Sequence, residues 1–199
     1  MIFRIDNSKL YMVDLDFENE ELEKAFVDTQ NANGVFQYMF VTDDQLPYNP
    51  YPTTPFYMVD SNSAIVLDTD RMLDNYKQET IDTINRMRDS MIEEGYTWTD
   101  PLDSTKQYVF GLEESDKISM IALATAVNLG QTENLFFITK DNITLPLTVD
   151  QAKDLALKSF SYVSYIYYTA RTYKDRILRA TTFEDIATIL SELDSQINS

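Results

Sequence analysis

Two close pairs of aspartates are the residues of this chain whose spacing could support metal chemistry. Asp14 and Asp16, like Asp68 and Asp70, each place two carboxylates two positions apart, and divalent cations such as Ca²⁺ prefer oxygen ligands. Neither pair lies in a loop with the alternating acidic residues and the glycine of a calcium site. Asp68 is also well placed to cap a helix. We therefore predict no metal site.

Groups for covalent or acid–base catalysis are missing or lack support. The chain has no histidine and no cysteine, which removes the commonest general base, the thiolate nucleophile and most transition-metal ligands. It has no glycine-rich phosphate loop, and no Ser or Lys lies in a recognisable nucleophile motif. A glycosidase pair of carboxylates would need a sugar-binding cleft, whereas the single tryptophan, Trp98, falls in a predicted hairpin. We expect no enzymatic activity, no catalytic residues and no cofactor.

Tyrosine is the residue type that indicates a binding role. The chain has 13 Tyr and 11 Phe against 1 Trp, and tyrosine gives broad amphipathic contact area at protein interfaces. The alternative is that these tyrosines are half-buried in their own domain with the hydroxyl in water. The candidate interface residues are Tyr48, Tyr51, Tyr162, Tyr165, Tyr168 and Arg171.

The net charge of −17 is spread unevenly along the chain. Residues 1–66 hold 11 acidic and 3 basic side chains, residues 67–130 hold 13 and 6, and residues 131–199 hold 9 and 7. Binding to nucleic-acid phosphates needs a basic patch, so we expect no nucleic-acid ligand.

Membrane association is also not expected. No apolar run approaches the roughly 18 residues that suggest a membrane span, and residues 1–6 lack the pattern of a signal peptide. We expect a soluble protein that is synthesised in a cytoplasm.

Residues 1–66 are predicted to form an N-terminal β-rich region. Asn19 is placed to cap a short helix with an acidic first turn, which ends near Gly34. Residues 43–55 contain four prolines and two tyrosines and are predicted to form an irregular loop that packs either on a partner or on its own domain. Strands are predicted at residues 2–5, 10–15, 35–41, 56–60 and 64–67.

Residues 67–199 are predicted to form a second, α+β domain in the order helix, hairpin, helix, hairpin, helix, helix. The first helix begins at Asp68 or Thr69 and ends at Gly95. The second is capped by Ser115, has one apolar face, and is closed by Gly130. That apolar face consists of Ile118, Ile121, Ala122 and Leu129. The hairpins pair residues 96–98 with 107–110, and 135–139 with 143–145. The fold class is therefore α+β.

The long helix begins with a capping box at residues 148–151 and is apolar on several faces. Its principal stripe has the four-three spacing of a helix–helix seam: Ala152, Ala156, Ser159, Val163, Ile166, Ala170, Tyr173 and Ile177. Two further faces carry Leu155, Tyr162 and Tyr165, and Phe160, Tyr167 and Tyr168. Such a helix is either central to its domain or shared with another chain. Arg171, Lys174, Arg176 and Arg179 follow near its end, where the helix dipole favours cations. Thr181 and Glu184 are predicted to cap the last helix.

Several of these segments, in this order, resemble a small domain of unknown function from tailed phages and prophages. That domain occurs in tail-fibre proteins and tail-fibre assembly proteins. The resemblance covers about residues 77–189. It rests on residues 95–98 (GYTW), 114–116 (ESD), 137–142 (FITKDN), 147–148 (LT) and 180–186 (ATTFEDI).

The resemblance implies a structural protein of the phage tail, either part of a tail fibre or an adaptor near the baseplate, which acts by protein–protein contacts. Its partners would be other tail or fibre subunits, or further copies of itself, and it would be located in the virion. One alternative is a tail-fibre assembly chaperone that is absent from the mature virion. An alternative of another class is an acidic nucleic-acid mimic that inhibits a host defence protein.

Overall fold

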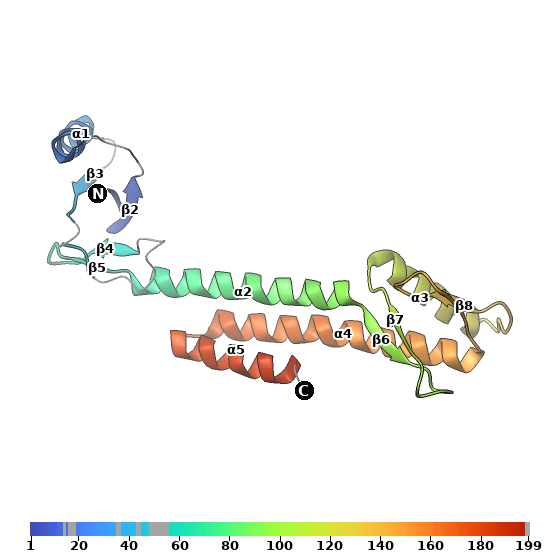
Figure 1. Ribbon diagram of the computed structural model, residues 1–199. Coiled ribbons are helices and arrows are strands. Elements are labelled where there is room, and N and C mark those ends of the chain that lie inside the picture. The colour runs from blue at the N-terminus through green and yellow to red at the C-terminus, as the bar shows by residue number, and fades with distance from the viewer. Residues whose placement is uncertain (14, 16–18, 35–36, 43–44, 48–55, 198–199) are drawn as a thin grey trace. The chain divides into compact units, whose positions relative to one another are not determined.

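The computed structural model describes residues 1–13, 15, 19–34, 37–42, 45–47 and 56–197. The chain divides into two compact units, Met1–Tyr76 and Lys77–Ser199, and we describe each by itself. Figure 1 labels their elements. N-terminal antiparallel strands are followed by a mainly helical part, which confirms the predicted α+β class. The predicted domains 1–66 and 67–199 stay a prediction.

The first unit contains a five-stranded antiparallel sheet in the order β3-β1-β2-β4-β5. Phe3 in β1 lies opposite Met12 in β2 and Met39 in β3. The buried face carries Phe3, Leu10, Val41 and Tyr57. The strands are β1 (Ile2–Asp6), β2 (Lys9–Val13), β3 (Gln37–Phe40), β4 (Tyr57–Val59) and β5 (Ile65–Leu67). Strand β1 extends one residue beyond its prediction, whereas β4 and β5 are shorter than predicted.

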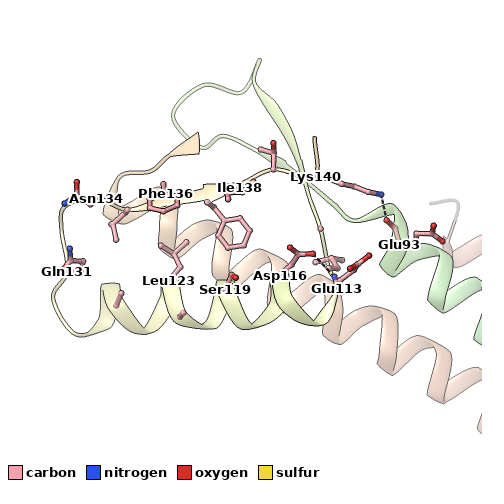
Figure 2. A pocket seen from close by; sticks show the side chains of 17 residues that line it. Glu93, Glu113, Asp116, Ser119, Leu123, Gln131, Asn134, Phe136, Ile138 and Lys140 are labelled. Carbon is pink, nitrogen blue, oxygen red and sulfur yellow. Dashed lines mark hydrogen bonds between the residues drawn. The ribbon is translucent and has the colours of Figure 1, made fainter. Parts of the chain in front are cut away.

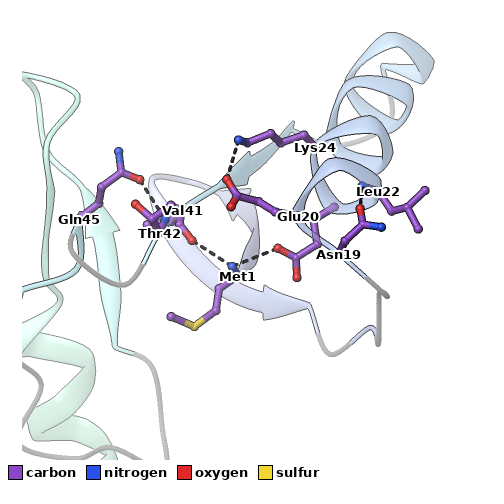
Figure 3. Close-up of polar contacts among 9 residues, drawn as sticks. Met1, Asn19, Glu20, Leu22, Lys24, Val41, Thr42 and Gln45 are labelled. Atoms are coloured by element: carbon purple, nitrogen blue, oxygen red, sulfur yellow. Dashed lines mark hydrogen bonds and ion pairs between the residues drawn. The ribbon is translucent and has the colours of Figure 1, made fainter.

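Helix α1 (Glu20–Asn33) packs against β3. The Asn19 side chain accepts a hydrogen bond from the Leu22 backbone N–H, and Gly34 ends the helix with a φ of 72°, as predicted. Figure 3 shows a bond between the start of β1 and the residue that follows β3: the Met1 nitrogen donates to the Val41 carbonyl oxygen at 3.0 Å. The same nitrogen lies 3.5 Å from the Glu23 carboxylate.

The first turns of α2 (Thr69–Glu94) complete this unit. Asp68 accepts a hydrogen bond from the Arg71 N–H at 3.0 Å, so it caps the helix as predicted. The Arg71 guanidinium donates to the carbonyl oxygen atoms of Leu10 in β2 and Tyr57 in β4. Arg71 therefore ties the start of α2 to two adjacent strands.

The second unit contains the rest of α2 and seven further elements. These are β6 (Tyr96–Thr99), β7 (Gln107–Phe110), α3 (Glu114–Asn128), β8 (Phe136–Ile138), β9 (Thr144–Pro146), α4 (Val149–Arg179) and α5 (Phe183–Ile197). Helices α2, α4 and α5 lie side by side in Figure 1. Lys174 in α4 donates to Asn85 in α2 at 2.9 Å, and Arg176 pairs with Glu192 in α5 at 2.6 Å.

A buried tryptophan connects the first hairpin of this unit to α4. Trp98 is fully buried in a cluster with Phe110 and Leu155, and its indole N–H donates to the Asp154 carboxylate at 2.8 Å. Nearby, the Gln151 side chain donates to Asp100 at 2.8 Å while also serving the predicted capping box with Thr148. These bonds fix the start of α4 on the hairpin.

Gly95 ends α2 as predicted, with a φ of 89°. A Cβ atom at this position would lie 2.4 Å from the Phe110 carbonyl oxygen. Only glycine combines the left-handed backbone with so close an approach to β7.

Two predicted caps are wrong. Helix α3 begins at Glu114 rather than after Ser115, and its N-cap is Glu113, whose N–H donates to the Asp116 carboxylate at 3.2 Å. Helix α5 is capped by Thr182 and Asp185, which bond reciprocally, rather than by Thr181 and Glu184. In both cases an aspartate at the third helical position sets the start of the helix.

The apolar face predicted for α3 is not the face that the structure buries. Ile118, Ile121 and Leu129 are 59%, 65% and 83% exposed, whereas Met120, Leu123 and Val127 are buried. Both sets satisfy helical spacing, so periodicity alone does not separate them. The buried set joins the core around Trp98.

Candidate functional site

Helix α4 has an exposed apolar surface that we call the outer face. Most of its residues are separated by three, four or seven positions, so they share one side of the helix. Leu157, Phe160 and Tyr168 are 68%, 71% and 73% exposed. The outer face consists of Leu157, Phe160, Tyr167, Tyr168, Arg171 and Leu178.

The opposite side of α4 is buried. Leu155, Ile166 and Ile177 are fully or almost fully covered, and the predicted seam from Ala152 to Ile177 is buried or half-buried at every position. The structure thus confirms that α4 is central to its unit. It also leaves a second apolar side of the same helix exposed.

The structure separates the predicted interface residues into different environments. Tyr168 and Arg171 lie on the outer face, where Arg171 Nε is 3.1 Å from an Asp175 carboxylate oxygen. Tyr162 is half-buried against Tyr96, with ring centroids 5.2 Å apart. Their common role in an interface stays a prediction.

Tyr162 and Tyr165 each contact a neighbouring element of their own unit. Burial raises the pKa of the Tyr162 hydroxyl, with the negative charge of Glu94 as a second cause. The Tyr165 hydroxyl donates to the Gln196 carbonyl oxygen in α5 at 3.5 Å. These contacts hold both residues toward neighbouring elements of their own unit.

Tyr48 and Tyr51, and most of the predicted loop 43–55, lie outside the described residues. Asp14 and Asp16 lie outside them too. Within the described part of the chain, no group of acidic residues has an arrangement that could hold a metal ion. Asp68 is engaged as the helix cap.

Sequence reasoning did not single out Leu157 and Leu178, which extend the outer face beyond its aromatic residues. The signal was available, because both continue the helical spacing of Phe160 and Tyr168. Each directly follows a residue of the predicted seam, Ala156 or Ile177, and was therefore not recognised as part of a second side of the helix. Among the described residues, no helix has the length and apolar character needed to cross a membrane.

Comparison with known proteins identifies the second unit. Residues 75–190 match the family model described as a domain of unknown function, DUF4376. No curated protein and no solved structure matches the chain. The matched segment begins in α2 and ends in α5, so it contains the whole of α4. Because the match covers more than half of the chain, the protein belongs to the DUF4376 family.

Proposed function

We propose that this protein is a structural subunit of a phage tail and that it binds other tail subunits through the outer face of α4. The observation that carries the proposal is the exposure of Leu157, Phe160 and Tyr168 along one side of the helix. Contiguous exposed apolar surface is typical of protein–protein contact sites.

The composition of the outer face also supports this function. Tyrosine, phenylalanine and arginine are enriched at interfaces, and all three occur within three turns of α4. Phe160 and Tyr168 supply apolar area for burial in a partner, and Arg171 supplies donors at the same surface. The phage setting comes from the sequence resemblance to tail-fibre and tail-fibre assembly proteins.

The experiment combines particle composition with a surface variant. Particles of the source phage are purified, and the protein is quantified by mass spectrometry against the capsid protein. We expect copy numbers that match tail symmetry. Absence from the particles would overturn the structural assignment, and binding to a fibre subunit would then support an assembly chaperone.

The double variant Phe160→Ser with Tyr168→Ser tests the surface itself. Supplied to a phage that lacks the gene, it should fold normally but fail to enter particles. The matched control is Ile118→Ser with Ile121→Ser on α3, which also removes two exposed apolar side chains from the same unit. Equal loss of incorporation in both variants would show that the outer face is not the contact.

A further inference from the structure

The second hairpin has an open strand edge. Leu147 donates to the Leu135 carbonyl oxygen, and Thr139 donates to that of Ile143. Because hydrogen-bonded and outward-facing positions alternate along an antiparallel strand, the backbone groups of Phe136 and Ile138 point away from β9. Strand β8 pairs with β9 alone in its sheet. Among the described residues, no strand is therefore paired with this edge of β8 along Phe136–Ile138.

The other edge of the same hairpin is less suited to a further strand. Pro146 lies opposite Phe136 in the register, so its ring nitrogen faces outward and offers no hydrogen atom to a further strand. At the far end of the open edge, the Lys140 N–H donates to the Val109 carbonyl oxygen in β7. The backbone groups of Phe136 and Ile138 face the same way as the Lys140 N–H and remain available to a partner strand.

The open edge borders a groove of about 930 Å³. Figure 2 shows β8 running along one side of it and α3 along the other. The facing side of α3 carries small side chains, Ser119, Ala122 and Ala126, one or two turns apart. They leave space beside the strand that larger residues would fill. Phe136 and Ile138 are about half exposed and also line the groove.

One end of the groove is acidic. Glu93, Glu113 and Asp116 lie there together in Figure 2, with Lys140 as the only basic residue of the lining. The Lys140 amino group donates to the carbonyl oxygen atoms of Glu93 and Glu94 and so caps the end of α2. The lining therefore has three carboxylates and one ammonium group, and that ammonium already bonds backbone carbonyl oxygen atoms. This excess of negative charge favours a positively charged group from a partner.

We propose that this groove binds an extended peptide segment of another protein, which adds a strand to the open edge of β8. Its backbone pairs with Phe136 and Ile138, alternate apolar side chains contact the small side of α3, and a Lys or Arg lies at the acidic end. Strand addition to an exposed edge is a general mode of peptide recognition. This site is separate from the outer face of α4 and does not depend on the tail assignment.

The probe is a capped, fluorescent peptide of sequence Lys-Lys-Val-Thr-Val-Thr-Val, titrated against the full chain and followed by anisotropy. It can run in either direction, so its lysines can reach the acidic end in parallel or antiparallel pairing. Saturable binding is expected, and it should weaken as salt is raised. A version with Glu in place of both Lys residues should bind about tenfold less tightly.

Backbone pairing has its own readout. In amide hydrogen exchange followed by NMR, the N–H groups of Phe136 and Ile138 should become protected when the peptide is added. The Leu145 N–H, which faces β8 by the register, should already be protected without it. A peptide N-methylated at the alternate residues that face β8 cannot donate and should lose binding.

The groove is tested by filling it from the α3 side. Ala122→Trp should weaken peptide binding about tenfold or more, whereas Ile121→Trp places the same side chain at an exposed position of α3 outside the groove lining and should leave binding unchanged. Thermal melts confirm that both variants fold.

Three outcomes would overturn the proposal: equal binding by the N-methylated peptide, equal weakening by both Trp variants, or no protection at Phe136 and Ile138. Protection that appears with rising protein concentration and no peptide would instead show pairing between two copies. Failure here would leave the tail assignment standing, since incorporation into particles is tested through α4.

Discussion

The two apolar sides of helix α4 contain similar kinds of residue, yet only one of them is covered. The buried side alternates small residues such as Ala152, Ser159 and Ala170 with large ones, which lets neighbouring helices approach closely. The outer face carries Leu157, Phe160 and Tyr168, which stand free of their own unit. The comparison teaches that apolar character alone does not define the core.

The largest expected difference between the two sides is in stability. Leu155 is fully buried and Leu157 is 68% exposed, so Leu155→Ala should reduce the free energy of unfolding by about 2–5 kcal/mol. Leu157→Ala should change it by no more than about 0.5 kcal/mol. Urea unfolding followed by Trp98 fluorescence measures both. Equal losses would mean that the outer face is packed in solution.

The hydrogen bond between Trp98 and Asp154 should contribute less to the free energy of unfolding than Leu155 does. Trp98→Phe removes the indole N–H that bonds Asp154 and should cost about 1–3 kcal/mol, in part through lost volume. Asp154 keeps Lys158 as a partner at 2.9 Å, which limits the loss.

Unfolding of this variant has to be followed by far-UV circular dichroism, because the fluorescent residue is gone. Tyr108→Phe removes a hydroxyl from a ring that packs beside Trp98 and serves as the control, with a change within about 0.5 kcal/mol. A similar loss in both variants would argue against the Asp154 bond.

One substitution on the buried side should stabilise the protein. The Ser159 hydroxyl is buried without a hydrogen-bond partner among the described residues, and burying an unpaired polar group is unfavourable. Ser159→Ala should therefore raise the free energy of unfolding by about 1 kcal/mol.

Ser161 is the matched control, because its exposed hydroxyl donates to the Leu157 carbonyl oxygen at 2.9 Å. Ser161→Ala should leave stability within about 0.5 kcal/mol of the parent. Destabilisation by Ser159→Ala in a thermal melt would show that the hydroxyl has a partner in solution.

The smallest expected effect concerns the cap of α5, which packs on the buried side of α4. Hydrogen bonds from the Thr181 backbone N–H and from Thr182 lower the pKa of the Asp185 carboxyl below its usual value of 3.8. Because the folded pKa is the lower one, the cap stabilises fully above about pH 3.8 and is lost as the pH falls through the folded pKa.

Asp185→Ala should therefore destabilise the second unit at neutral pH and flatten its acid dependence between pH 4 and the folded pKa. Melting temperatures across that range, compared with Glu184→Ala in the same helical turn, provide the measurement. An unchanged acid dependence would contradict the assigned cap.

Much of the local structure followed from the sequence. Gly34 and Gly95 were correctly placed at helix ends because a left-handed backbone favours glycine, and the capping box at Thr148 follows from side-chain chemistry within one turn. The seam of α4 was correctly predicted because its period extends over many residues. Caps failed where two candidates stood one or two positions apart, as at Thr181 and Thr182.

The candidate sites depended on longer-range information. The face of α3 could not be chosen from its own spacing, since Ile118 and Met120 both belong to valid helical stripes. The open edge of β8 was not foreseen, because a hairpin prediction gives the pairing partner on one side and says nothing of the other. Pro146 was the available signal for which edge is less suited to a further strand.

The sequence by itself determined the α+β class, the order of helices and hairpins, and the apolar seam of α4, because capping, turn chemistry and periodicity act between residues close in the chain. Only the tertiary structure decided that Leu157 and Phe160 remain exposed while Leu155 is covered, and that β8 keeps an open edge beside the small residues of α3. Burial and strand pairing depend on contacts between segments distant in sequence, and those contacts form only when the chain is folded.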